Sequence, residues 1–127
     1  NYNRNLTDQW SLQAMRQAQR LKGLPIPQSK RQGLASLYDC SDDWIPIYDK
    51  SDLPGFYMAI GTSGNQYKNA PAVGILMSQL ITACEAGCDH DKEPVTYEME
   101  FTKRPCNIGF YSRLRKINKD SSFSVVG

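Results

Sequence analysis

A glycine-containing segment, residues 61–68, connects an apolar run to a stretch with helical periodicity, and it constrains the fold more than any other part of the chain. Its sequence is Gly-Thr-Ser-Gly-Asn-Gln-Tyr-Lys, and its two glycines permit a tight turn and a close approach of a ligand to the main chain. The first N–H groups of a following helix lack helical partners and carry partial positive charge. The segment therefore predicts a strand–turn–helix unit whose turn faces a phosphate, a carboxylate or a polarised cofactor oxygen.

The elements on either side of this turn are predicted from their apolar residues. Residues 56–60 form a continuous apolar run bounded by glycines, which is typical of a strand buried on both faces in a parallel sheet. A helix is expected to begin at Pro71, which suits a first helical turn, and to end before Gly87. Its apolar residues recur at helical spacing, and they are Val73, Leu76, Met77, Leu80, Ile81 and Cys84.

The N-terminal part predicts a helix followed by a hairpin. Thr7 suits an N-cap, and apolar residues at i+4 spacing form one narrow stripe, so the helix is expected to cover a surface until Gly23 and Pro25 end it. The stripe consists of Leu6, Trp10, Ala14, Ala18 and Leu21. Residues 34–38 and 44–48 are strand candidates, and the turn residues between them suggest that they pair with each other.

The residues after Gly87 combine a charged loop with one clear strand pattern. Residues 95–101 alternate apolar and polar side chains, which predicts a half-buried strand, and residues 121–126 are a candidate edge strand. Two charge clusters are interpreted as structural. The acidic cluster, expected to serve turns, is Asp39, Asp42 and Asp43, and the basic cluster, expected to be a solvated face, is Arg113, Arg115, Lys116 and Lys119.

Composition excludes several classes of function. The 127 residues suit one domain or a piece of a larger one, and a net charge of +2 is too mild to indicate nucleic-acid binding. The chain has no apolar run near the roughly 18 residues that span a bilayer and no signal segment, so a cytoplasmic protein without a membrane span is expected. The cysteines are too few for a disulfide scaffold, and the spacing of Cys84, Cys88 and His90, with a distant Cys106, is not a common zinc pattern. Because the first residue is not methionine, a piece of a longer chain is expected.

Other chemistries of a strand-to-helix turn fit these residues less well. Neither Gly-x-Gly-x-x-Gly nor the Walker Gly-Lys-Ser/Thr occurs, so the common nucleotide loops are not present. Ser63 is placed like the serine of a hydrolase nucleophile elbow, but Asn65 replaces the required glycine, and the single histidine, His90, lies in a charged loop. The structural alternative is an ordinary tight connection between a strand and a helix.

The order of the segments carries a family resemblance. Residues 34–39 (Leu-Ala-Ser-Leu-Tyr-Asp) and 45–47 (Ile-Pro-Ile) precede residues 53–61 (Leu-Pro-Gly-Phe-Tyr-Met-Ala-Ile-Gly), the rest of the turn, and residues 70–74 (Ala-Pro-Ala-Val-Gly). Behind an N-terminal helix, this order resembles the C-terminal part of the D-amino-acid oxidase-like FAD-dependent oxidoreductases, which include sarcosine and glycine oxidases. The resemblance covers roughly residues 7–87 and is most specific over residues 53–74.

The resemblance implies a flavin site on the turn. In that family the corresponding turn lies against the flavin ring, and its main-chain N–H groups face the N1 and C2 carbonyl side, where negative charge develops in the reduced cofactor. Lys68 corresponds to a lysine that helps to hold the substrate carboxylate, and Tyr38 to a substrate-facing position. The implied cofactor contacts are Gly61, Thr62, Ser63, Gly64, Asn65, Gln66, Tyr67 and Lys68.

Several departures from the family limit what the resemblance implies. The family often has Gly-His-Gly-Phe where residues 64–67 are Gly-Asn-Gln-Tyr, which leaves the substrate open, and Leu34 and Ser36 replace the usual Trp and Gly. Ser36 also stands where some members carry a flavin-linking cysteine, so FAD is expected to bind without a covalent bond. The dinucleotide-binding N-terminal half is missing, so the isolated chain is expected to bind FAD weakly or not at all and to be inactive.

The expected fold class is therefore α+β, as the C-terminal fragment of a two-domain FAD-binding oxidoreductase. Residues 1–52 would be a helix and an antiparallel hairpin of the substrate-binding domain. Residues 53–87 would be the last strand, turn and helix of the FAD-binding domain, and residues 88–127 a C-terminal extension. The expected partners are a small amine or amino-acid substrate and the remainder of the parent chain, with homo-oligomerisation left open. The rival interpretation is a small non-catalytic interaction domain whose turn is only structural.

Overall fold

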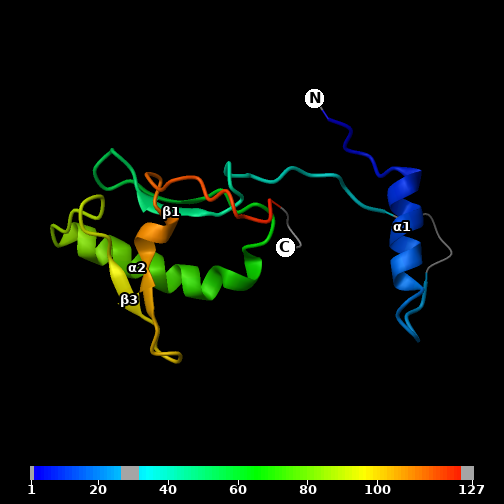
Figure 1. Ribbon diagram of the computed structural model, residues 1–127. Helices are drawn as coiled ribbons and strands as arrows, with labels where there is room; N and C mark the ends of the chain where they lie inside the picture. Colours follow the sequence, from blue (N-terminus) through cyan, green and yellow to red (C-terminus); the bar gives the residue numbers. More distant parts are fainter. Residues whose placement is uncertain (1, 27–31, 124–127) are drawn as a thin grey trace. The chain divides into compact units, whose positions relative to one another are not determined.

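The computed structural model describes residues 2–26 and 32–123, which belong to two compact units, Asn1–Leu37 and Tyr38–Gly127. Within these ranges the protein is a small mixed α/β structure with two helices and two small antiparallel sheets (Figure 1). This confirms the expected mixture of helices and antiparallel strands, whereas the assignment of its parts to the domains of a larger enzyme stays a prediction. No helix in the described ranges is long and apolar enough to cross a membrane.

The first unit contains one helix, α1 (Asp8–Ala18). The Thr7 hydroxyl accepts the N–H of Trp10 at 3.1 Å, which confirms the N-cap. The helix ends before the predicted Leu21, and none of its residues is buried, in keeping with its narrow apolar stripe. Residues on either side of α1 meet within this unit, because the N–H of Ala35 donates to the carbonyl oxygen of Arg4 at 3.2 Å.

The second unit opens with a hairpin of β1 (Ile47–Lys50) and β2 (Tyr57–Ile60), in which Ile47 lies opposite Ile60. The predicted pairing of residues 34–38 with residues 44–48 is wrong, because residues 34–38 form no strand. The segment that follows them bonds to the turn instead, since the carbonyl oxygen of Asp39 accepts the N–H of Ser63 at 2.9 Å. The loop after β1 closes the observed hairpin through a bond of 2.8 Å from the N–H of Ser51 to the carbonyl oxygen of Phe56.

The strand β2 differs from the prediction of a parallel strand buried on both faces. It is antiparallel, its first two residues are half-buried, and its last two are exposed, with 47% of Ile60 accessible. The reason is that α2 (Ala70–Glu85) makes its main contact with β1 and reaches β2 chiefly through the bond from the Tyr57 hydroxyl to Glu85. In the described ranges β1 is also the one strand that pairs with β2. Part of the apolar surface of β2 is therefore open.

The helix α2 follows the sequence prediction closely. A short 3₁₀ turn, η1 (Tyr67–Asn69), leads into it, and Pro71 lies in its first turn. Beyond its end Gly87 has φ of +97°, the N–H of Gly87 bonds to Cys84, and the N–H of Cys88 bonds to Ala83. These bonds form a Schellman motif and confirm Gly87 as the residue after the helix end.

The last elements are β3 (Thr96–Glu98) and β4 (Pro105–Asn107), which pair antiparallel, and the 3₁₀ turn η2 (Ile108–Tyr111). From β4 the chain passes α2 and reaches β1 (Figure 1). The predicted alternation holds up to Met99, but Phe101 lies in the turn after β3 and is 92% exposed. Residues 121–123 are not a strand, and the rest of the predicted edge strand lies outside the described residues. The buried core consists of Leu76, Leu80 and Ile108, with Tyr48 also buried on β1.

Candidate functional site

The turn after β2 has a left-handed backbone at three positions. Gly61, Ser63 and Gly64 have φ of +65°, +52° and +76°. Ser63 is fully buried and its hydroxyl donates to the carbonyl oxygen of Gly61 at 3.1 Å, so it is not presented as a nucleophile. The hydrolase alternative therefore has no support from this geometry, and the serine instead stabilises the turn.

Tyr38 and the turn lie together in the structure. A Cβ atom on Gly64 would be 2.8 Å from carbons of the Tyr38 ring, so the ring lies directly on the glycine backbone. The carboxylate of Asp39 accepts both the hydroxyl and the N–H of Thr62, and these two bonds lower the pKa of Asp39. Asp39 thus holds the Tyr38 segment against the turn, as expected of a carboxylate that serves a turn.

A hollow of about 400 Å³ lies beside the turn, between β2 and the start of α2. Within the part of the chain that the structure describes, the main-chain N–H groups of Gly64 and Gln66 have no hydrogen-bond acceptor. Both residues belong to the lining of the hollow, so the chain has two unpaired donors at its wall. The lining residues are Tyr48, Ala59, Thr62, Gly64, Gln66, Tyr67, Ala70 and Val73.

Tyr48 is a site residue that the sequence interpretation missed. It lies on β1, and its hydroxyl donates to Gln66 Oε1 at 2.9 Å. The same oxygen accepts Asn69 Nδ2 at 2.9 Å, and Gln66 Nε2 donates to Asn65 Oδ1. Burial raises the pKa of Tyr48 to about 12, so the phenol stays a neutral donor. A strand position 18 residues upstream gives no local signal of this contact.

Lys68 follows the lining residue Tyr67 in the chain. It is exposed on η1 and does not belong to the hollow's lining. Its neighbour Tyr67 does line the hollow and is almost fully exposed. Of the nine predicted site residues, the structure places Thr62, Gly64, Gln66 and Tyr67 on the hollow's wall and Tyr38 against Gly64.

The basic cluster is not uniformly solvated, which corrects the sequence interpretation. The side chains of Arg113 and Arg115 are only 15% and 14% exposed. Arg113 Nη1 lies 3.1 Å from Oδ2 of the fully buried Asp49, and Arg115 Nη2 lies 2.6 Å from Asp43 Oδ1. Burial alone would raise the pKa of Asp43, but hydrogen bonds, above all from Arg115, outweigh it and lower this pKa to about 2.

The cysteines and His90 do not converge on a metal. Among the described residues no three His, Cys, Asp or Glu side chains form a metal-binding group. His90 is buried, its Nδ1 accepts the N–H of Val95 at 3.0 Å, and its Nε2 lies 3.8 Å from Asp49 Oδ1 without a hydrogen bond. Its role here is to hold the loop between α2 and β3.

Comparison with known proteins found no match for this chain among protein-family models, curated proteins or solved structures. The family resemblance therefore depends on the quoted segments of the sequence alone.

Proposed function

We propose that this chain is the C-terminal part of a D-amino-acid oxidase-like, FAD-dependent oxidoreductase that oxidises a small amine or amino acid. The observation that supports it best is the combination of the strand β2, the glycine turn and α2 around a hollow whose wall carries unpaired N–H groups at Gly64 and Gln66. These elements coincide with residues 53–74, the segment on which the resemblance is most specific.

The residues of the hollow fit the acceptor edge of a flavin. When bound, FAD would accept a hydride equivalent from the α-carbon of the substrate. The N–H groups of Gly64 and Gln66 are held in place by the turn and can stabilise negative charge without reorganising. Because Gly64 has no Cβ, the Tyr38 ring lies against its main chain, and the ring and the turn form one wall of the proposed site. In this proposal Tyr38 lines the substrate pocket and Lys68 anchors the substrate carboxylate.

The open surface of β2 supports a parent chain over a self-sufficient domain. A strand buried on both sides would have indicated a complete sheet, whereas Phe56 and Ile60 are about half exposed. In the proposal, the remainder of the parent chain covers this surface and supplies the grip on the ADP portion of FAD. The proposed location is cytoplasmic.

The test is to purify the protein that contains this chain with its upstream sequence. We expect the visible absorption spectrum of bound flavin and consumption of an electron acceptor with at least one small amine or amino acid from a panel. A purified, folded parent that contains no flavin and takes up none from added FAD would contradict the proposal. A Lys68→Ala variant that leaves KM unchanged for every oxidised acid would remove Lys68 from the substrate site.

The rival function, a non-catalytic interaction domain, is favoured by the same exposed apolar side chains. It would use the open surface of β2 to bind a protein partner and the turn only as a connection. The parent's flavin content separates the two proposals, since the rival requires none.

A further inference from the structure

We propose that Tyr48 is a positioning residue that couples the C-terminal extension to the turn at residues 61–68. This inference rests on the proposed function only in taking that turn as the cofactor-facing part of the site. The extension, residues 88–127, is the part for which the sequence suggested no role. Its contacts with β1 carry the inference.

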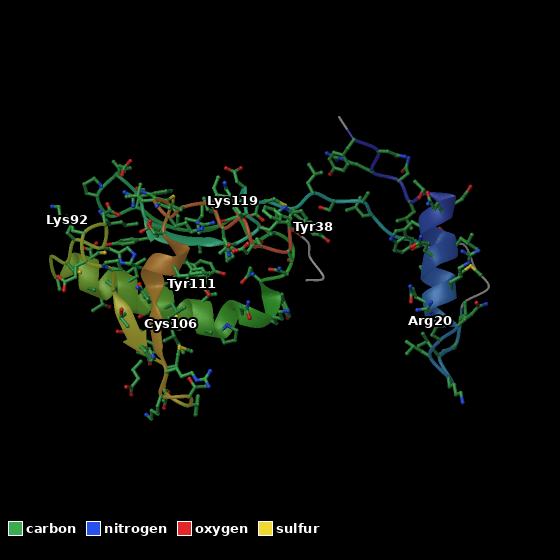
Figure 2. All side chains as sticks on the ribbon, viewed as in Figure 1. Arg20, Tyr38, Lys92, Cys106, Tyr111 and Lys119 are labelled. Atoms are coloured by element: carbon green, nitrogen blue, oxygen red, sulfur yellow. The ribbon has the colours of Figure 1, made fainter. Side chains whose placement is uncertain are left out.

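The first step is the contact between the extension and Tyr48. The Tyr48 ring is 3% exposed, and its centroid lies 4.9 Å from that of Tyr111, at the end of η2. Tyr111 itself, labelled in Figure 2, packs against the buried core. The buried Tyr48 ring therefore packs against a residue of the extension.

The second step is the anchor at the neighbouring residue of β1. Asp49 Oδ2 accepts the Ser112 hydroxyl at 2.9 Å, the main-chain N–H of Arg113 at 2.8 Å and Arg113 Nη1 at 3.1 Å. Asp49 has no exposed surface, and charged hydrogen bonds of this kind are the strong ones. The extension thus fixes β1 at two adjacent residues, one through a ring contact and one through a buried carboxylate.

The third step leads from Tyr48 to the turn. Gln66 Oε1 accepts the hydroxyl of Tyr48 and the amide of Asn69, which directs Gln66 Nε2 to the Oδ1 atom of Asn65. The carboxamide of Asn65 then presents its nitrogen as a further donor. Tyr48 therefore fixes the side chain of Gln66, whose main-chain N–H, like that of Gly64, is an unpaired donor of a residue on the wall of the hollow.

The first test uses nuclear magnetic resonance on the 127-residue chain. Tyr48→Phe keeps the ring and removes the hydroxyl, so we expect the side-chain amide signals of Gln66 and Asn69 to shift and to exchange faster. Tyr57→Phe is the matched control, because its hydroxyl donates to Glu85 Oε1 at 2.7 Å and not to the turn. Unchanged Gln66 signals in folded Tyr48→Phe would overturn the inference. If that variant fails to fold, Gln66→Leu removes the same bond from the other side, and unchanged ring signals of Tyr48 would then overturn it.

Tyr111→Leu tests the link to the extension. We expect it to shift the same Gln66 signals while Phe101→Leu, at a ring of the extension that is 92% exposed, leaves them in place. If Tyr111→Leu leaves the Gln66 signals unchanged, the extension does not act on the turn through Tyr48.

The second test uses the parent flavoprotein. We expect Tyr48→Phe to shift the absorption spectrum of the bound flavin and to lower kcat more than it raises KM, with Tyr57→Phe unchanged in both. A purely structural role would lower the amount of folded enzyme without changing the spectrum of what remains, and that result would overturn the inference. A parent without flavin would contradict the proposed function instead, and the amide signals of the 127-residue chain would then decide the role of Tyr48 alone.

Discussion

Gly64 meets two requirements that an alanine would violate. Its φ is +76°, and the Tyr38 ring occupies the space of a Cβ atom. We expect Gly64→Ala to lower the free energy of unfolding by about 1–3 kcal/mol, because a left-handed backbone and a ring displacement are both unfavourable. Gly74→Ala is the control, since its Cβ would meet nothing within 4 Å in the interior of α2, and it should stabilise by roughly 0.5–1 kcal/mol. Unfolding in urea measures the change in free energy of unfolding for both variants. A change of the same sign in both would contradict the two requirements stated for Gly64.

His90 makes stability depend on pH in a stated direction. Burial lowers the pKa of His90 below its ordinary value of 6.5. The positive charges of Lys50 and Arg113 lower this pKa further, whereas the negative charges of Asp49 and Asp91 raise it by less than burial lowers it. The unfolded chain then binds more protons than the folded chain just below pH 6.5, so stability should fall as the pH falls through this window. Protonation of Nδ1 would also break its bond to Val95.

The measurement is the free energy of unfolding in urea between about pH 5 and pH 7, where histidine changes charge. We expect a decline toward the acidic end in the native chain and a flatter profile in His90→Gln. Equal slopes in the two proteins would exclude His90 as the cause. The carboxylates with lowered pKa, such as Asp43 at about 2, titrate below this window and leave it unaffected.

At the scale of the elements, the extension is held to β1 by buried charge. Arg113 is the only described side chain that pairs with Asp49 by a hydrogen-bonded ion pair, and it also bonds to Asp91 and Asp52. We expect Arg113→Met to lower the free energy of unfolding by about 3 kcal/mol, because it leaves a buried carboxylate without its cation. Lys116→Met is the control, with an effect within about 0.5 kcal/mol for an exposed position. Equal effects on the urea midpoint would show that the extension is not anchored by this pair.

At the scale of the whole molecule, the chain is proposed to be one part of a flavin site. We expect the isolated chain to show no micromolar binding of FAD by fluorescence titration, since it has no Gly-x-Gly-x-x-Gly loop to hold the pyrophosphate. The parent protein should bind it. Micromolar binding by the isolated chain, with turnover of an amino acid, would contradict the proposed division of the site.

Local signals predicted the elements whose ends are set by nearby residues. The N-cap at Thr7, the start of α2 near Pro71 and its end at Gly87 each depend on contacts within a few residues, so they are legible in the sequence. The alternation from Val95 to Met99 was correct for the same reason, because one face of that strand packs on the core.

Pairing between distant segments was decided only in the tertiary structure. Arg113 bonds to Asp49, 64 positions away in the sequence, and Arg115 bonds to Asp43, 72 positions away. A basic cluster that was fully solvated would have the same sequence pattern as this paired one. The spacing of apolar residues in the sequence also did not predict that β1 pairs with β2. Nor did it predict the contact from Tyr48 to Gln66. By itself the sequence determined a strand, a glycine turn and a helix, since these depend on local backbone preferences. Which side chains surround that turn depended on how the extension packs against β1, because burial and charge pairing are properties of the folded chain.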